Sequence, residues 1–291
     1  MVVDDKEKRI LITTGGGKIN EYDFDGHFVR DIKTPYSGNL MPLDSSRIAL
    51  DVENSFYDVK ERLVILNEKG EVEKSFPRYQ LFEHTGYGRI DGKMWLIPRI
   101  TKFHDVVCFN EAYNDTIFEL KNNELQMRYF VDWGKYALKP EYIIYENQEY
   151  AEKKQKCFWL KGFYETDRYI FMPEFRYPFT FVYDKKENRT KECTYAGSKN
   201  SKLYNELFKN VEGGFLNNVD GGLVQNIEGI SLDCKYIFSS YYASDVKEYF
   251  EEAGYREQVL YPDKQAKLKA LVNSIDEDKH NLFIMMSKLK E

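Results

Sequence analysis

The chain has 291 residues, of which 42% are hydrophobic and 31% charged, and its formal net charge is −6 at pH 7. This acidic balance disfavours nucleic acids and anionic membranes as partners, because both repel negative charge. Aromatic residues make up 16% of the chain, with 23 Tyr and 20 Phe. This composition favours a sheet protein, in which aromatic rings pack on pleated surfaces.

The cysteines and the hydropathy pattern exclude further classes of protein. The four cysteines stand far apart in the sequence, and no C-x-x-C pair occurs, so the sequence predicts buried thiols, no metal site and no cofactor. No apolar run approaches the roughly 20 residues of a membrane helix, so no membrane-spanning segment is expected. The opening residues turn polar at once, and we identify no signal segment in this chain.

A repeated hairpin pattern dominates the rest of the sequence. Apolar and polar residues alternate on both sides of Asp25-Gly26, and Asp-Gly between two alternating runs is a strong hairpin signal. The pattern returns around Gly70 and, more loosely, at 116–130 and 179–194. Four short antiparallel strands in about 40 residues are what one propeller blade requires.

Taken in chain order, the pattern predicts an all-β fold, a single β-propeller domain spanning residues 1–291. Five blade-like sets of strands are expected, near 1–33, 38–77, 84–133, 157–194 and 212–291. A helical insertion is expected near 140–154, and further short helices at 201–209, after Ser244 or Asp245, and after Asp263. The apolar ending at 281–289 is expected to join a sheet whose other strands come from elsewhere in the chain.

Two features carry a resemblance to known propellers. The run from Tyr22 to Val29 resembles the hairpin of the NHL-type repeat. The segment 115–120, the turn 218–222 and the ending 283–290 together resemble the six-bladed β-propeller family of cell-envelope lipoproteins in Gram-negative bacteria. The similarity covers most of the chain. It implies a six-bladed propeller and an extracytoplasmic location, but no catalytic residues, since the family has no established catalytic set.

The five predicted sets leave two explanations open under this resemblance. Either one blade is lacking from this chain, or one of the sets has been counted wrongly. The lipoprotein signal that family members carry is absent from this chain.

Two segments are candidates for a binding site. The first is an expected loop at 99–105 that contains Arg99 and His104, and the second contains Glu174, Arg176 and Tyr177. Loops at one rim of a propeller converge on its channel, so equivalent loops of different blades can meet there. Arg99, His104 and Arg176 would then contact an anion or a sugar. The alternative is that the arginines pair with Asp or Glu at the rim beside an aromatic plug.

The leading prediction for function is a non-catalytic binding or scaffolding propeller at the cell envelope, with a glycan, peptide or protein as its ligand. The rival prediction is a propeller hydrolase or lactonase that uses channel carboxylates, with or without a divalent cation. Its candidate carboxylates lie near predicted strand ends and are Asp51, Asp105, Glu174 and Asp220. A third possibility is a structural subunit of a larger assembly.

Overall fold

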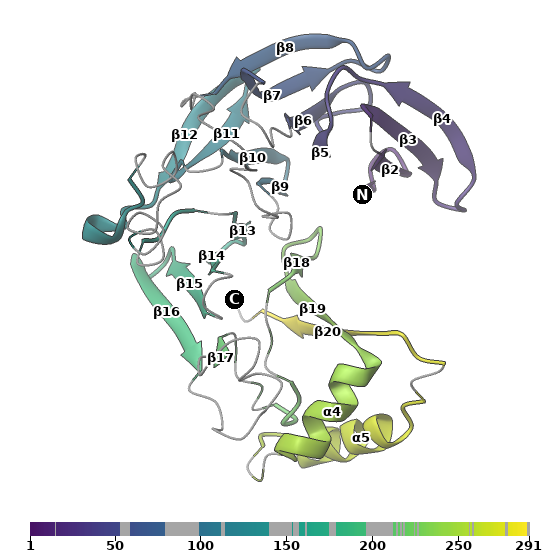
Figure 1. Cartoon of the computed structure of the whole chain (residues 1–291), viewed down its shortest axis with the longest axis vertical. Coiled ribbons are helices and arrows are strands. Elements are labelled where there is room, and N and C mark those ends of the chain that lie inside the picture. Colours follow the sequence, from purple (N-terminus) through teal and green to yellow (C-terminus); the bar gives the residue numbers. More distant parts are fainter. Residues whose placement is uncertain are drawn as a thin grey trace. The chain divides into compact units, whose positions relative to one another are not determined.

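Antiparallel hairpins build both halves of the chain in the computed structural model (Figure 1). The residues that the structure describes are 1–14, 16–52, 59–78, 99–111, 114–139, 153, 157–160, 162–174, 179–195, 212–213, 215, 217, 219–223, 225, 227–255, 257, 259–276 and 279–289. The chain divides into two compact units, Met1–Gly162 and Phe163–Glu291.

The first unit contains three four-stranded sheets, and in each of them the strands pair antiparallel in chain order. The first sheet consists of β1 (Val2–Asp4), β2 (Arg9–Thr14), β3 (Lys18–Asp23) and β4 (Phe28–Lys33). The second sheet consists of β5 (Gly38–Pro42), β6 (Ile48–Val52), β7 (Glu61–Leu66) and β8 (Val72–Pro77). The third sheet consists of β9 (Ile100–Phe103), β10 (Val106–Asn110), β11 (Thr116–Lys121) and β12 (Glu124–Phe130), and a 3₁₀ turn follows at Gly134–Tyr136.

The second unit contains two sheets and two described α-helices. The fourth sheet of the chain consists of β13 (Tyr164–Glu165), β14 (Tyr169–Glu174), β15 (Phe179–Asp184), β16 (Arg189–Tyr195) and β17 (Glu212–Gly213). The fifth consists of β18 (Gly229–Ile230), β19 (Tyr236–Tyr242) and β20 (Leu282–Lys288). Helices α4 (Ala243–Ala253) and α5 (Pro262–Asn273) lie between β19 and β20 in the sequence.

The tight turns of the first two sheets follow from their sequences. Gly26 and Gly70 both have a φ of +83°, a left-handed conformation that glycine adopts without steric cost. Ahead of each glycine, a side-chain oxygen accepts hydrogen bonds from two backbone N–H groups of the turn. Asp23 plays this part in the first sheet and Asn67 in the second. Such Asx turns explain why Asp or Asn precedes the glycine in the repeat.

The core of the first unit lies between its sheets. All five residues of β6 are buried, and alternate side chains point to opposite faces of the sheet. Leu50 packs in a cluster with Leu11 and Ile19 of the first sheet. Ala49 packs on the other side with Val107 and Phe109 of the third sheet. The second sheet is therefore covered on both faces, which accounts for the apolar run in β6.

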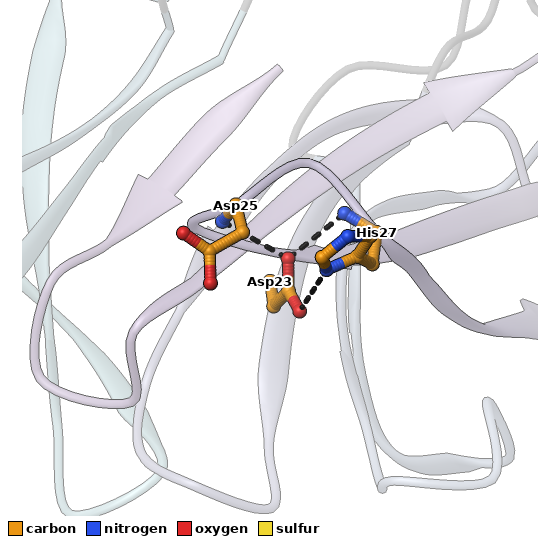
Figure 2. Close-up of side chains that lie close together, drawn as sticks. All are labelled: Asp23, Asp25 and His27. Carbon is orange, nitrogen blue, oxygen red and sulfur yellow. Dashed lines mark hydrogen bonds and ion pairs between the residues drawn. The ribbon is translucent and has the colours of Figure 1, made fainter.

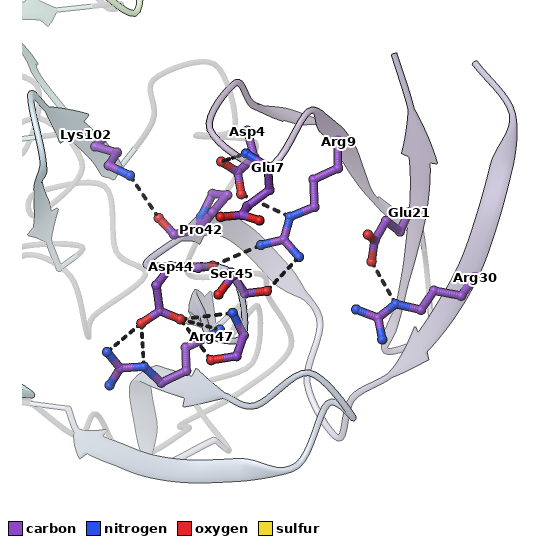
Figure 3. A network of polar contacts seen from close by, with 11 residues as sticks. Asp4, Glu7, Arg9, Glu21, Arg30, Pro42, Asp44, Ser45, Arg47 and Lys102 are labelled. Carbon is purple, nitrogen blue, oxygen red and sulfur yellow. Dashed lines mark hydrogen bonds and ion pairs between the residues drawn. The ribbon is translucent and has the colours of Figure 1, made fainter. Parts of the chain in front are cut away.

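Polar contacts also connect these three sheets (Figure 3). The buried guanidinium of Arg9 pairs with Asp4 at 3.0 Å and donates to the backbone carbonyls of Asp44 and Ser45, between β5 and β6. From the third sheet, the Lys102 ammonium donates to the carbonyl of Pro42 at 3.4 Å. The end of β5 and the turn that follows it thus receive cationic donors from the first and third sheets.

The fold is an all-β propeller, and its described residues form five blades, one for each sheet. The expected six-bladed type is therefore wrong in its number of blades. The expectation for the last strand is also wrong, because β20 pairs with β19 along its whole length, from Tyr236–Lys288 to Tyr242–Leu282. The last strand, β20, therefore completes the fifth sheet, although helices α4 and α5 separate it from β19 in the sequence.

Other expectations about single elements are corrected or lie outside the described residues. Ile100–Phe103 is strand β9 and not part of a loop, because it pairs with Val106–Phe109. In the predicted set 157–194, Phe158 forms a bridge with Ala137, and strand β13 begins at Tyr164. The helical insertion at 140–154, apart from Lys153, and the helix at 201–209 lie outside the described residues. So does the part of the predicted set 84–133 up to residue 98.

The two described helices begin one residue earlier than their predicted caps. Helix α4 follows Tyr242, and no side chain caps its first turn. Helix α5 has Pro262 at its first position, where the missing N–H of proline costs no hydrogen bond. Gly254 follows α4 with a φ of +68°, a positive value that glycine adopts readily, and glycine commonly ends a helix. No described helix has both the length and the apolar character needed to cross a membrane.

Candidate functional site

Arg99 lies directly before β9 and is held in a buried ion pair. Its Nε donates to Oδ2 of Asp51, the fourth residue of β6, at 3.2 Å. Burial raises the pKa of the Asp51 carboxyl, although the guanidinium groups of Arg99 and Arg78 favour its charged form. The Arg99 side chain is only 15% exposed. For Arg99, this geometry matches the alternative prediction from the sequence, in which the arginine pairs with Asp or Glu instead of contacting a ligand.

A second buried ion pair lies at the same end of the neighbouring strands. Arg62 at the start of β7 donates from Nη1 to Glu111, directly after β10, at 2.9 Å. Its guanidinium carbon also lies 4.8 Å from the ring centre of Phe118, a cation–π arrangement. The described buried carboxylates at this end, Asp51 and Glu111, are therefore each neutralised by an arginine, an arrangement that serves structure.

The other residues predicted from the two candidate segments are divided between the two units and the part of the chain outside the described residues. His104 lies at the opposite end of β9, in an exposed turn with a φ of +52°, and its ring tilts against Phe103. Five residue steps of about 3.3 Å separate it from Arg99 along the strand. Glu174 is the last residue of β14 and pairs with Phe179, in the second unit. Arg176 and Tyr177 lie outside the described residues.

The candidate carboxylates of the hydrolase prediction belong to both units, Asp51 and Asp105 to the first and Glu174 and Asp220 to the second. Asp105 lies in the exposed β9–β10 turn, paired with Lys6, at the end of β9 opposite to Asp51. Asp220 lies in the second unit, where its Oδ1 accepts from Asn217 and from the backbone of Gly222. Within the first unit, Asp51 and Asp105 therefore form no facing acid–base pair.

One described group has the composition of a metal site. The side chains of Asp23, Asp25 and His27 lie within 4.8 Å of one another in the β3–β4 turn (Figure 2). Asp23 already accepts from two backbone N–H groups and from His27 Nδ1 at 3.1 Å. The second sheet repeats the arrangement with Asn67, whose amide donates to Glu71. The recurrence shows that these side chains fix the hairpin turn.

Asp115 is the first residue of the 115–120 segment, and its side chain connects the third sheet to later segments of the first unit. Its Oδ1 accepts from Trp133 Nε1 at 2.9 Å and from the backbone N–H of Leu160 at 2.8 Å. Burial raises the pKa of this carboxyl, and the two hydrogen bonds oppose that rise. One oxygen therefore connects the start of β11 to two later segments of the first unit.

A groove in the second unit offers a different kind of site. We define the β14–β20 groove as the hollow between one face of β14, β15 and β16 and the end of the hairpin pair at which β19 begins and β20 ends. Its first part has a volume of about 460 Å³. Buried Phe171, Val182 and Ile237 give it an apolar lining, which Phe215 extends. A second part of about 500 Å³ adjoins it, and Arg168, Tyr169 and Leu289 line both.

The polar lining of the β14–β20 groove is cationic. Its described lining residues include two carboxylates, Asp167 and Asp184, and a larger set of basic side chains. These basic residues are Arg168, Lys185, Lys186, Lys191, Lys235 and Lys288. An excess of positive charge in one groove contrasts with the net negative charge of the whole chain.

Only part of this positive charge is neutralised within the protein. Arg168 binds Asp184 through Nη2 at 2.8 Å, and this pairing holds the pKa of the Asp184 carboxyl below its ordinary value. Lys185 binds the buried Glu165 at 2.6 Å. Lys191 and Lys288, by contrast, form no ion pair with any described residue. They leave unneutralised charge beside the apolar lining.

One of the four cysteines, Cys193, lies in the same groove and offers a thiol for chemical labelling. None of them forms a disulfide, and Cys108, Cys157 and Cys234 are buried. Cys193 on β16 is partly exposed and lines the first part of the groove. The sequence did not point to these lining residues, because the walls of the groove come from strands far apart in the chain.

The comparisons with known proteins establish the fold class. A family model described as "Domain of unknown function (DUF4934)" matches residues 1–288. A crystal structure of a presumed exported protein from Bacteroides fragilis aligns with a TM-score of 0.65 and 15% identity, and covers 99% of this chain and 76% of its own. At this identity the likeness shows the fold alone.

Two lyase structures are more distant. An inactive virginiamycin B lyase from Staphylococcus aureus with quinupristin aligns at a TM-score of 0.33 and 11% identity, over 66% of this chain and 58% of its own. An oligogalacturonate lyase in complex with manganese aligns at 0.35 and 10% identity, over 77% and 50%. These scores carry no argument about activity. No curated protein sequence matches the chain.

Proposed function

Since the chain belongs to the family described as domain of unknown function DUF4934, whose description names no activity, we propose its function from the geometry of its sites. The protein is a non-catalytic binding or scaffolding propeller of the cell envelope. Its ligand is a glycan, a peptide or a protein partner, and it binds in the β14–β20 groove.

One observation carries this proposal: the groove combines a buried apolar lining with lysines that no described acid neutralises. Binding sites commonly consist of an apolar cavity with a few polar groups that fix the orientation of the ligand. The described buried carboxylates of the first unit point away from catalysis, since each is paired with an arginine. They are Asp4, Glu21, Asp51 and Glu111. A general acid or base needs a carboxyl that can reach a substrate.

The cell-envelope location is supported by the Bacteroides fragilis relative, which is named as a presumed exported protein. The NHL-like character of the hairpins and attachment as a lipoprotein are parts of the same proposal. The Tyr22–Val29 run supports the NHL-like character, and the resemblance of the segments 115–120, 218–222 and 283–290 supports the lipoprotein attachment.

The test uses the thiol of Cys193 as a reporter of the groove. The purified chain is screened by thermal unfolding against neutral oligosaccharides, acidic oligosaccharides and peptides. For each compound that raises the melting temperature, the rate of alkylation at Cys193 is measured by mass spectrometry. Cys108 and Cys157, which are buried, provide internal controls for global unfolding.

The proposal predicts that a stabilising ligand slows alkylation of Cys193 and leaves the two control cysteines unchanged. A ligand that raises the melting temperature without slowing alkylation of Cys193 would place the binding site elsewhere. Chemical conversion of a bound compound, detected in the same samples, would show that the protein is an enzyme.

A further inference from the structure

We propose that the β14–β20 groove binds an acidic peptide segment in an extended conformation. An apolar side chain of the peptide enters the space beside Phe171 and Ile237, and its carboxylates face the lysines along the groove. This inference rests on the proposed binding function and adds the chemical class of the ligand.

Charge complementarity is the first argument. Lys191 and Lys288 both line the first part of the groove, and no described residue forms an ion pair with either. Lys186 and Lys235 line the second part. Several cations distributed over two adjoining hollows suit a ligand with several spaced negative charges. A ligand with one anionic group would use only part of them.

The state of the polar side chains argues against a sugar ligand. Asn217 donates to Asp220 at 2.8 Å and accepts from the backbone of Val219 at 3.1 Å. The buried Gln225 donates to the backbone carbonyl of Ile237 at 3.2 Å. The amides that could read sugar hydroxyl groups are therefore already used within the protein.

The arrangement of the aromatic rings in the groove also argues against a sugar ligand. The guanidinium of Arg168 lies over the ring of Tyr169, 5.1 Å from its centre. Phe171 is 3% exposed and meets Phe215 edge-to-face, at 5.9 Å and 89°. Rings that cover one another offer no open flat face for a pyranose to stack on, but their edges can accommodate an inserted aliphatic or aromatic side chain.

The shape of the groove favours a chain over a compact molecule. Each of its two parts alone falls within the roughly 300–1,000 Å³ of small-molecule sites. Arg168, Tyr169 and Leu289 line both parts, so the two hollows lie side by side, and the apolar lining is in the first. An extended peptide can place one apolar anchor there and continue past the lysines of the second part.

The experiment measures the binding of fluorescent probe peptides by anisotropy. The probe alternates Glu with Leu and Phe over eight residues. A second peptide replaces each Glu by Lys, and a third replaces each Leu and Phe by Ser. The protein variants are Lys191→Glu with Lys288→Glu, and a matched control, Lys264→Glu with Lys267→Glu, which makes the same charge change on the exposed surface of α5.

The acidic probe is expected to bind, to slow alkylation of Cys193, and to weaken as the salt concentration rises. Reversing both groove lysines should raise its Kd about tenfold, since the probe loses two exposed charge pairs. The control variant should bind as the unaltered protein does. The Lys-substituted probe and the Ser-substituted probe should each bind more weakly than the acidic probe. Circular dichroism confirms that both variants are folded.

Three results would overturn the inference. If the two double variants weakened binding of the acidic probe equally, the effect would come from the overall charge of the protein and not from binding in the groove. If polyuronate oligosaccharides or a fatty acid protect Cys193 while the acidic probe does not, the ligand class is wrong, although the proposed binding function stands. If the acidic probe, the polyuronates and every compound of the wider screen leave both Cys193 and the melting temperature unchanged, the proposed function fails together with the inference.

Discussion

Asp115 allows a sharp test of how one buried carboxylate supports the third sheet. Both described hydrogen bonds of its side chain, from Trp133 Nε1 and from the Leu160 N–H, end on Oδ1. Asp115→Asn keeps a carbonyl oxygen that can accept both bonds and removes a charge whose burial is unfavourable. Asp115→Ala removes the acceptor from both donors. At about 1 kcal/mol for each partly buried bond, the alanine variant should lose about 2 kcal/mol, and the asparagine variant little or nothing.

The pH dependence gives an independent check on Asp115. Burial raises the pKa of its carboxyl in the folded protein above the ordinary value. The folded chain therefore binds this proton more tightly than the unfolded chain, and the contribution is most favourable at low pH and is lost as the pH rises through the folded pKa. Relative to Asp115→Asn, the unaltered protein should gain stability as the pH falls from 7 towards 4.

Thermal unfolding of the three proteins at pH 7 and at pH 4.5 measures both effects. Each kcal/mol corresponds to about 2 °C in melting temperature for a chain of this size. If Asp115→Asn were destabilised as strongly as Asp115→Ala, the carboxylate charge itself would be what stabilises the sheet. The reasoning from Oδ1 geometry and burial would then be refuted.

Two further predictions concern the first two sheets. Gly26→Ala should cost about 1 kcal/mol for its left-handed φ alone, because nothing lies within 4 Å of the added methyl group. Gly70→Ala should cost at least twice as much, since its methyl group would meet the carbonyl oxygen of Lys33 at 1.9 Å, and equal melting temperatures for the two variants would contradict this. Asp51→Ala should lose about 3–5 kcal/mol in urea unfolding because it removes the carboxylate from the buried guanidinium of Arg99, and a loss below about 1 kcal/mol would show that the pair is unimportant.

The fold class was accessible from the sequence because the hairpin signals are local. The Asp-Gly turn and the alternation around it are contained within β3 and β4, and the Gly70 copy lies between β7 and β8 in the same way. Strand β9 was mistaken for a loop because its four residues, between Arg99 and His104, carry a charge and only two large apolar side chains. Its strand conformation comes from pairing with β10, an interaction that single-residue preferences do not show.

The site was less accessible because its geometry depends on contacts between distant residues. The partner of Arg99 is 48 positions away in the sequence, and no local pattern connects the two. Lys191 and Lys288, on the two walls of the β14–β20 groove, are separated by two helices and the rest of the fifth sheet. Alternation correctly indicates which residues share one face of a strand, but it cannot indicate which sheet that face meets.

The pairing of β20 with β19 has a consequence for how the protein is made. In the first three sheets every strand pairs with its immediate successor, so each can assemble from nascent hairpins while synthesis continues. Joining Tyr242 to Leu282 instead closes a loop about ten times longer than a hairpin turn, at an additional entropic cost of roughly 2 kcal/mol. Until residues up to Lys288 have left the ribosome, the edge of β19 stays unpaired and open to intermolecular association. The rate of translation through α4 and α5 should therefore influence the yield of native protein more than the rate through the first three sheets.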